Sequence, residues 1–290
     1  MIPAIRFDPN ASRSEAQRQL TLLFTGRDTA ALDARLLLCT ALSIDHAALV
    51  RDYDRPIGAA AMRIAELAQR RAYGEPVSRI LGRREFWGLE FGIGPAVLDP
   101  RPETEVLVET VIETLPARRE AALCILDLGI GSGAILAALL DHFPNAFGIG
   151  VDVSEAACRV ARDNLLRLRL GPRAGIFCGN WGDALGGNFD VIVANPPYVA
   201  SRDLAGLAPE VRGYDPQLAL DGGEDGYAAY RRIVPSLARL AAPESLVAFE
   251  VGAGQADEVA SLLASAGLVN PAARNDLAGR TRVVVAKCAP

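Results

Sequence analysis

This chain of 290 residues is poor in the residues from which several common active sites are built. It has only two histidines, His46 and His142, and neither falls in a recognisable motif, so we expect no histidine-based catalysis. Its five cysteines form no CxxC pair and have no zinc-ligand spacing, so we expect no metal site. An odd number of cysteines without a secretory signal is typical of a reducing cytoplasm.

Long apolar runs and an excess of basic residues are also missing. No apolar run reaches the ~18 residues of a membrane-spanning helix, and the first residues lack the pattern of a signal peptide. The net charge of −5 argues against a broad basic surface for nucleic acid. Because half of the residues are hydrophobic, a large core is possible. We therefore expect a soluble, cytoplasmic, monomeric protein with no membrane contact and no stable nucleic-acid partner.

The pattern of residues changes twice along the chain. Residues 1–75 show apolar helical spacing without strand-like alternation, which predicts a small helical bundle. Its adjacent Arg70 and Arg71 are interpreted as solvated surface. Residues 76–102 are rich in glycine, proline and aromatics, which predicts a connector with a β-hairpin. Residues 103–290 are predicted to form the catalytic domain.

Within this last segment, apolar strand-like runs alternate with helical patterns. Strands are predicted at residues 123–128, 147–153, 175–178, 191–194, 246–251 and 282–286. Strands separated by helices indicate an α/β fold with a doubly wound, Rossmann-like parallel sheet. Ligands bind such sheets at the carboxyl ends of the strands, so motifs at those positions are candidate sites.

A glycine-rich loop follows the first of these strands. It reads Asp127-Leu128-Gly129-Ile130-Gly131-Ser132-Gly133. Alternate glycines let the backbone turn sharply and approach a ligand closely. Asp152 ends the next strand, where a carboxylate can accept hydrogen bonds from ribose hydroxyls. The loop is therefore a candidate cofactor site.

The loop alone does not identify the cofactor. Gly129, Gly131 and Ala134 also satisfy the dinucleotide pattern G-x-G-x-x-G/A, so an NAD enzyme is an alternative, as is a tight turn without a ligand. Asp127 favours a cofactor that carries an amino acid, since its carboxylate can face an ammonium group, although it could instead brace the turn.

The tetrapeptide Asn195-Pro196-Pro197-Tyr198 follows a later strand. Two prolines stiffen the loop and remove two backbone donors. The Asn195 side-chain oxygen and the Pro196 carbonyl can together accept both N–H bonds of a planar NH₂ group, and Tyr198 offers a face for stacking.

This arrangement suits methyl transfer to a planar nitrogen. Such a nitrogen is a poor nucleophile, and two acceptors on its hydrogens stabilise the positive charge that develops on it in the transition state. Alone, the tetrapeptide also fits an ordinary turn. Together with the glycine loop it favours an S-adenosylmethionine-dependent methyltransferase over an NAD enzyme, which has no use for it.

Flanking motifs resemble the PrmC/HemK family, whose members methylate the glutamine of the Gly-Gly-Gln loop of class-one peptide chain release factors. The resemblance covers nearly the whole chain and rests on the following runs, in order: residues 33–38, 75–77, 85–89, 97–105, 127–133, 195–198, 250–255 and 276–280. It implies that the helical domain binds the release factor. Ribosomal-protein glutamine methyltransferases, nucleic-acid amine methyltransferases and a non-catalytic cofactor-binding module are the alternatives.

The resemblance also assigns roles to individual residues. Gly129, Ile130, Gly131, Ser132 and Gly133, with Asp127, would wrap the methionine part of S-adenosylmethionine; Asp152 would hold its ribose and Trp181 would lie against its adenine. Asn195 would bind the glutamine amide beside the cofactor, in a slot shaped by Pro196, Pro197 and Tyr198.

Three positions depart from the family pattern. Ile130 replaces a frequent Thr where the backbone is expected to matter more than the side chain. Asp99 replaces a branched aliphatic and is expected either to face solvent or to change the charge of the substrate slot. Asn180 replaces an acid, which weakens the expected adenine contact.

Overall fold

The computed structural model describes residues 4–289. They form two compact units. The first comprises the chain up to Gly82 together with Pro209–Tyr214, and the second comprises Arg83–Ala208 and the chain from Asp215 onward. The helical part therefore extends past the expected boundary at residue 75, and the hairpin expected in a separate connector belongs to the second unit.

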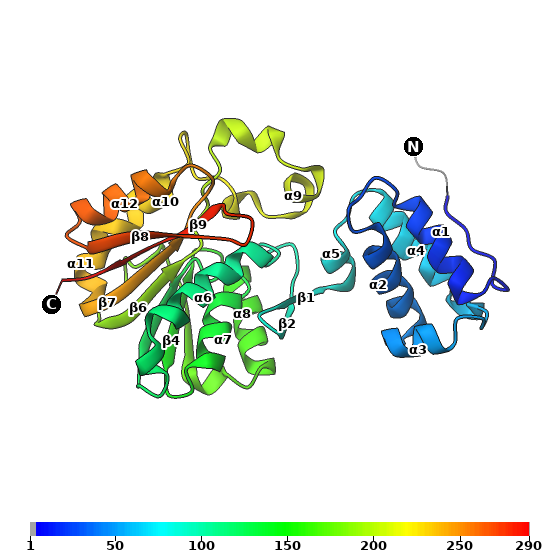
Figure 1. The fold of residues 1–290 in the computed structure, drawn as a ribbon, viewed down its shortest axis with the longest axis horizontal. Helices are drawn as coiled ribbons and strands as arrows, with labels where there is room; N and C mark the ends of the chain where they lie inside the picture. The colour runs from blue at the N-terminus through cyan, green and yellow to red at the C-terminus, as the bar shows by residue number, and fades with distance from the viewer. Residues whose placement is uncertain (1–3, 290) are drawn as a thin grey trace. The chain divides into compact units, whose positions relative to one another are not determined.

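The first unit is a helical bundle, as predicted (Figure 1). Its helices are α1 (Arg13–Leu23), α2 (Ala30–Leu42), α3 (His46–Arg51), α4 (Ala61–Ala72), α5 (Val77–Leu81) and the short α9 (Pro209–Tyr214). Helix α1 begins at a capping box, in which the Ser12 hydroxyl accepts from the Glu15 amide and the Glu15 carboxylate accepts from the Ser12 amide. Leu20, Leu38 and Leu67 are fully buried in its core.

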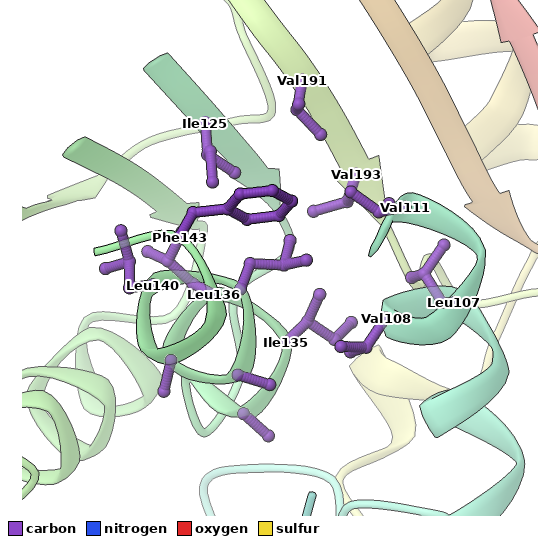
Figure 2. Close-up of a cluster of buried hydrophobic side chains, with 14 of the residues drawn as sticks. Leu107, Val108, Val111, Ile125, Ile135, Leu136, Leu140, Phe143, Val191 and Val193 are labelled. Carbon is purple, nitrogen blue, oxygen red and sulfur yellow. The ribbon is translucent and has the colours of Figure 1, made fainter. Parts of the chain in front are cut away.

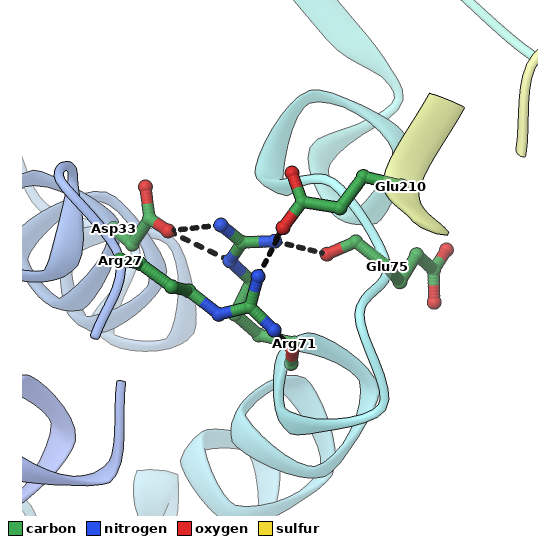
Figure 3. A network of polar contacts seen from close by, with 5 residues as sticks. All are labelled: Arg27, Asp33, Arg71, Glu75 and Glu210. Carbon is green, nitrogen blue, oxygen red and sulfur yellow. Dashed lines mark hydrogen bonds and ion pairs between the residues drawn. The ribbon is translucent and has the colours of Figure 1, made fainter. Parts of the chain in front are cut away.

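A cluster of ion pairs around the buried Arg71 joins α9 to this bundle (Figure 3). The Arg71 guanidinium is 2.6 Å from Asp33 of α2 and 2.8 Å from Glu210 of α9, and Arg27 also pairs with Glu210. Only 4% of the Arg71 side chain is exposed, so its interpretation as solvated surface is wrong. Its neighbour Arg70 pairs with Glu75. A buried charge is tolerated only with such partners.

The second unit contains a hairpin and a larger sheet. The hairpin pairs β1 (Arg83–Phe86) with β2 (Leu89–Gly92). Along the chain, the strands of the larger sheet are β3 (Cys124–Leu128), β4 (Phe147–Asp152), β5 (Ala174–Cys178), β6 (Phe189–Ala194), β7 (Ala241–Glu250), β8 (Val269–Asn275) and β9 (Thr281–Lys287). The helices are α6 (Glu105–Thr114), α7 (Ala134–His142), α8 (Glu155–Arg167), α10 (Ala228–Ile233), α11 (Leu237–Leu240) and α12 (Ala256–Ser265).

The sheet has the order β5-β4-β3-β6-β7-β9-β8. The first five strands in this order are parallel, as expected, whereas β9 and β8 are antiparallel to their neighbours. The sheet is therefore mostly parallel and doubly wound, as predicted, with an antiparallel pair of strands at one edge. Strand β8 was missed because it is largely exposed and contains Pro271, which suits only an edge strand and hides the apolar pattern.

Both faces of the sheet are covered by helices. Ile125 of β3 and Val193 of β6 pack against α6 and α7, which contribute Val111 and Leu136 (Figure 2). Residues next to them along these strands point to the other face and pack against α10, α11 and α12. Because both faces of the central strands are buried, nearly every residue in them is apolar, and their sequences show continuous apolar runs. In residues 4–289, no helix is long and apolar enough to cross a membrane.

Candidate active site

A cavity of about 560 Å³ opens at the carboxyl ends of β3, β4 and β6. This is the point where the chain order of the sheet reverses, and ligands of doubly wound folds bind there. The lining includes most of the predicted site residues: Gly129, Ile130, Gly131, Ser132, Asp152, Trp181, Asn195 and Pro197. It does not include Asp127, Gly133, Pro196 or Tyr198. The sheet thus brings together motifs that are far apart in the sequence.

The glycine loop has the backbone that only glycine adopts easily. Gly129, Gly131 and Gly133 have φ angles of 81°, 52° and 83°. A Cβ on Gly129 would lie 3.3 Å from the Trp181 ring, whereas the same atom on Gly131 would meet almost nothing. The loop therefore leaves a smooth backbone surface beside an aromatic ring. That surface fits an extended cofactor with a flat base.

Asp152 closes this loop through its carboxylate. One oxygen accepts from the Gly131 amide at 3.0 Å, and the other accepts from the Ser154 amide at 2.8 Å. The side chain also lines the cavity, so each oxygen keeps a further lone pair for a ligand. The predicted contact of Asp152 with a ribose stays a prediction. The structure shows in addition that Asp152 braces the glycine loop through the Gly131 amide.

Asp127 lies beneath the loop, fully buried and outside the cavity lining. Burial raises the pKa of this carboxyl to about 7; the Leu136 amide acts in the opposite direction, and the charge of Asp152 adds to the rise. A buried carboxyl near neutrality can interact with a cation that approaches the loop. Its predicted contact with an ammonium group stays a prediction.

The side chain of Ile130 matters more than expected. It is only 4% exposed, and a Cβ on Gly150 of β4 would lie 2.0 Å from its Cδ1 atom. Ile130 therefore occupies the space that Gly150 leaves open and packs the loop onto the sheet. This pairing explains how an isoleucine is accommodated at the position.

The tetrapeptide divides its side chains between the cavity and the interior. Asn195 lines the cavity, and its Nδ2 donates to the Thr104 hydroxyl at 3.2 Å. The Tyr198 hydroxyl instead donates to the Glu250 carboxylate at 3.5 Å. Burial, together with the nearby charge of Glu250, raises the pKa of Tyr198. The structure thus turns the Tyr198 hydroxyl inward, and the stacking role predicted for its ring stays a prediction.

Three residues beside the tetrapeptide carried no role in the sequence analysis. Thr104 and Glu250 contact Asn195 and Tyr198 as described above. Gln255 donates from Nε2 to the Tyr198 carbonyl at 3.0 Å, and its Oε1 accepts from the Gly252 amide at 2.9 Å. Thr104 lies in the run 97–105, and Glu250 and Gln255 lie in the run 250–255; both runs supported the family resemblance, which was the available signal.

Asp99 and Asn180, the other two departures from the family pattern, lie close to the site. Asp99 is 4% exposed and pairs with Arg84 at 3.8 Å, so it does not face solvent; it is also absent from the cavity lining. Arg101 lines the cavity and pairs with Asp215. Asn180 lines the cavity and donates to Asp183 at 3.2 Å. No cluster of His, Cys, Asp and Glu suitable for a metal ion occurs in the described part of the chain.

The sequence matches two known family models, and the fold resembles a solved structure. Residues 15–82 match the family model "PrmC N-terminal domain", and residues 102–208 match "Methyltransferase small domain". The solved hMettl16 catalytic domain, bound to an RNA hairpin, shares the fold with a TM-score of 0.57 at 15% identity, over 78% of this chain and 84% of that one. The fold and the site together define an S-adenosylmethionine-dependent methyltransferase.

Sequence relatives narrow this class. A release factor glutamine methyltransferase of Bradyrhizobium diazoefficiens is 47% identical over 91% of this chain and 90% of its own length. One of Caulobacter vibrioides is 42% identical over 90% of each chain. The chain belongs to the release factor glutamine methyltransferase family.

Proposed function

We propose that this enzyme transfers a methyl group from S-adenosylmethionine to the side-chain amide nitrogen of the glutamine in the Gly-Gly-Gln motif of class-one release factors. The names of its relatives support the substrate. The observation that carries the proposal is the presence of Asn195 and the glycine loop on the lining of one cavity.

The site residues divide the work between cofactor and substrate. The bound cofactor supplies an electrophilic methyl group on a sulfonium. The backbone of Gly129–Gly133 holds its methionine part, Asp152 its ribose and Trp181 its adenine. Asp127 supports the loop from below. These assignments rest on the family pattern and on the position of the loop, Asp152 and Trp181 around the cavity.

Asn195 and Pro196 act on the substrate. Their two oxygens accept the N–H bonds of the glutamine amide and orient its nitrogen toward the methyl group. This arrangement stabilises the positive charge that develops on nitrogen and requires no prior deprotonation. Pro197 and Tyr198 shape the slot, and Gln255 supports it through its hydrogen bond to the Tyr198 carbonyl.

Intact-mass measurement tests this proposal. Wild-type enzyme with S-adenosylmethionine should add one methyl to a release factor and none to a variant whose motif glutamine is replaced by glutamate. Parallel reactions with ribosomal protein and nucleic acid examine the alternatives. Asn195→Ala should lower kcat sharply while cofactor affinity survives. Methylation of another acceptor, without release factor modification, would refute the substrate assignment.

We propose further that the helical unit binds the release factor. Leu22 and Leu23, in the last turn of α1, and Leu32 and Leu36, in the first half of α2, are between 37% and 73% exposed. Helices α1 and α2 pack against each other, and exposed apolar groups on such a pair are candidates for an interaction surface. Leu22→Glu should raise KM for the release factor, whereas Met62→Glu on α4, where the side chain is 84% exposed, should leave it unchanged. Equal KM values in the two variants would contradict this role.

Finally, we propose that the enzyme acts as a monomer in the cytoplasm, where its proposed substrate functions. Sedimentation of the active enzyme at assay concentration tests the monomeric state, and a dimer as the active species would contradict it.

A further inference from the structure

One wall of the cavity is formed by a segment that carried no role in the sequence analysis. Pro216, Leu218, Ala219 and Asp221 lie on the lining, in and around the short 3-10 helix Gln217–Ala219, and we call residues 216–221 the 216–221 wall. Leu218 is 62% exposed. A leucine that is exposed on an open surface needs no explanation, but one on the lining of a cavity is a group that a bound molecule would cover.

The start of this wall is fixed by Asp215. Its carboxylate pairs with Arg101 and accepts from the Asp99 amide at 3.3 Å, and only 2% of the Asp215 side chain is exposed. Arg101 itself lies on the cavity lining. Because a guanidinium has five N–H groups, Arg101 can hold Asp215 and still donate to a carbonyl oxygen in the cavity. The wall and a donor beside it are therefore held in place together.

The end of the wall is joined to the residues at the tetrapeptide. The Val199 amide donates to the Leu220 carbonyl at 3.0 Å, and the Gly222 amide donates to the Val199 carbonyl at 2.8 Å. A Cβ on Gly222 would lie 2.8 Å from the carbonyl oxygen of Pro197, so a residue without a side chain is needed for this close approach. The wall is thus attached to the segment that carries Asn195, which places it on the side of the cavity where the substrate would bind.

The charges on the lining indicate which kind of molecule suits this side. Among residues 4–289, the charged residues on the lining are Arg101, Asp152 and Asp221, and Arg101 is already paired with Asp215. A nucleic acid would bring a phosphate backbone, which binds to basic groups. The lining carries more acidic than basic residues, so it disfavours phosphates. An apolar wall with one donor beside it instead suits an uncharged stretch of polypeptide.

We propose that Leu218 is a specificity-determining residue whose side chain, held by the 216–221 wall, packs against the uncharged stretch of the release factor that carries the acceptor glutamine. This inference rests on the proposed function for the identity of the partner. Leu218 acts on no reacting atom, so its contact with the substrate is the same before and during methyl transfer. Loss of such a contact raises KM for the substrate and leaves kcat unchanged.

Leu218→Glu tests the inference, with Leu166→Glu as its matched control. Leu166 on α8 is 64% exposed, much like Leu218, but it is not on the cavity lining. In Leu218→Glu, KM for the release factor should rise about tenfold or more, a loss of ~1.4 kcal/mol or more in binding free energy, while kcat and the affinity for S-adenosylmethionine stay unchanged. Leu218→Met, which keeps an apolar side chain of similar size, should retain a KM close to that of the wild type. Equal KM values in Leu218→Glu and Leu166→Glu would overturn the proposal.

Two further measurements separate the inference from the proposed function. Leu218→Lys should raise KM as Leu218→Glu does, and a KM below that of the wild type would indicate an acidic partner and overturn the proposal. Calorimetry of release factor binding to enzyme loaded with S-adenosylhomocysteine, the demethylated cofactor, requires no methyl transfer. Kd should rise in Leu218→Glu and not in Leu166→Glu, and equal Kd values in the two refute the inference. A wild-type enzyme that binds the release factor but does not methylate it refutes only the proposed function.

Discussion

The burial of Glu250 should make the stability of the second unit depend on pH. Its folded-state pKa of about 7 lies above the ordinary value of 4.5, so the folded protein binds this proton more tightly than the unfolded chain. The resulting stabilisation is complete below pH 4.5 and is lost as the pH rises through about 7. Since one pKa unit corresponds to ~1.4 kcal/mol, ionisation costs about 3 kcal/mol in total.

Glu250→Gln removes the cost of ionising Glu250. Asp127 titrates in the same range, but it is present in both the variant and the wild type, so its effect cancels when the two are compared. Between about pH 5.5 and about pH 8 the variant should gain about 2 kcal/mol of stability relative to wild type. For a unit of this size, the Tm of the variant minus that of the wild type should therefore be about 4–8 °C larger at about pH 8 than at about pH 5.5. Thermal unfolding followed by circular dichroism at the two pH values measures it. A Tm difference independent of pH would show that Glu250 does not titrate as described.

Three other substitutions test the remaining packing and binding arguments. Gly150→Ala should destabilise the fold by about 1–3 kcal/mol in urea unfolding because its Cβ meets Ile130, and Ile130→Ala should recover much of that loss; additive effects would contradict the contact. Arg71→Met should destabilise the helical unit by about 3–5 kcal/mol, because Asp33 and Glu210 lose their buried partner, and an unchanged Tm would contradict that. Trp181→Ala should weaken S-adenosylmethionine binding about tenfold in calorimetry, whereas equal affinity would place the adenine elsewhere.

Much of the site could be predicted because its residues follow strands directly. The loop after β3, Asp152 at the end of β4 and the tetrapeptide after β6 all converge once the strands are parallel, and the cavity lies at their carboxyl ends. Parallel pairing itself follows from the alternation of strands with helices.

The interior partners of these motifs could not be predicted in the same way. Thr104 precedes a helix and Glu250 ends β7, so nothing local in the sequence places Thr104 against Asn195 or Glu250 against Tyr198. Their roles depend on which side chains fill the space beneath the loop, and that depends on the packed structure. For the same reason the sequence does not distinguish Arg71 from a surface residue, because its partners Asp33 and Glu210 come from distant segments.

Because α9 belongs to the helical unit, exchanging segments between related proteins is constrained. In the described chain the polypeptide passes between the two units after Gly82, after Ala208 and after Tyr214. A chimaera joined only at the first of these points would confront a foreign helical bundle with the resident Glu210. Because Glu210 is a partner of the buried Arg71, the two segments must be inherited together. Recombination that respects only one boundary would produce poorly folded hybrids, so two stretches far apart in the sequence should evolve as one unit.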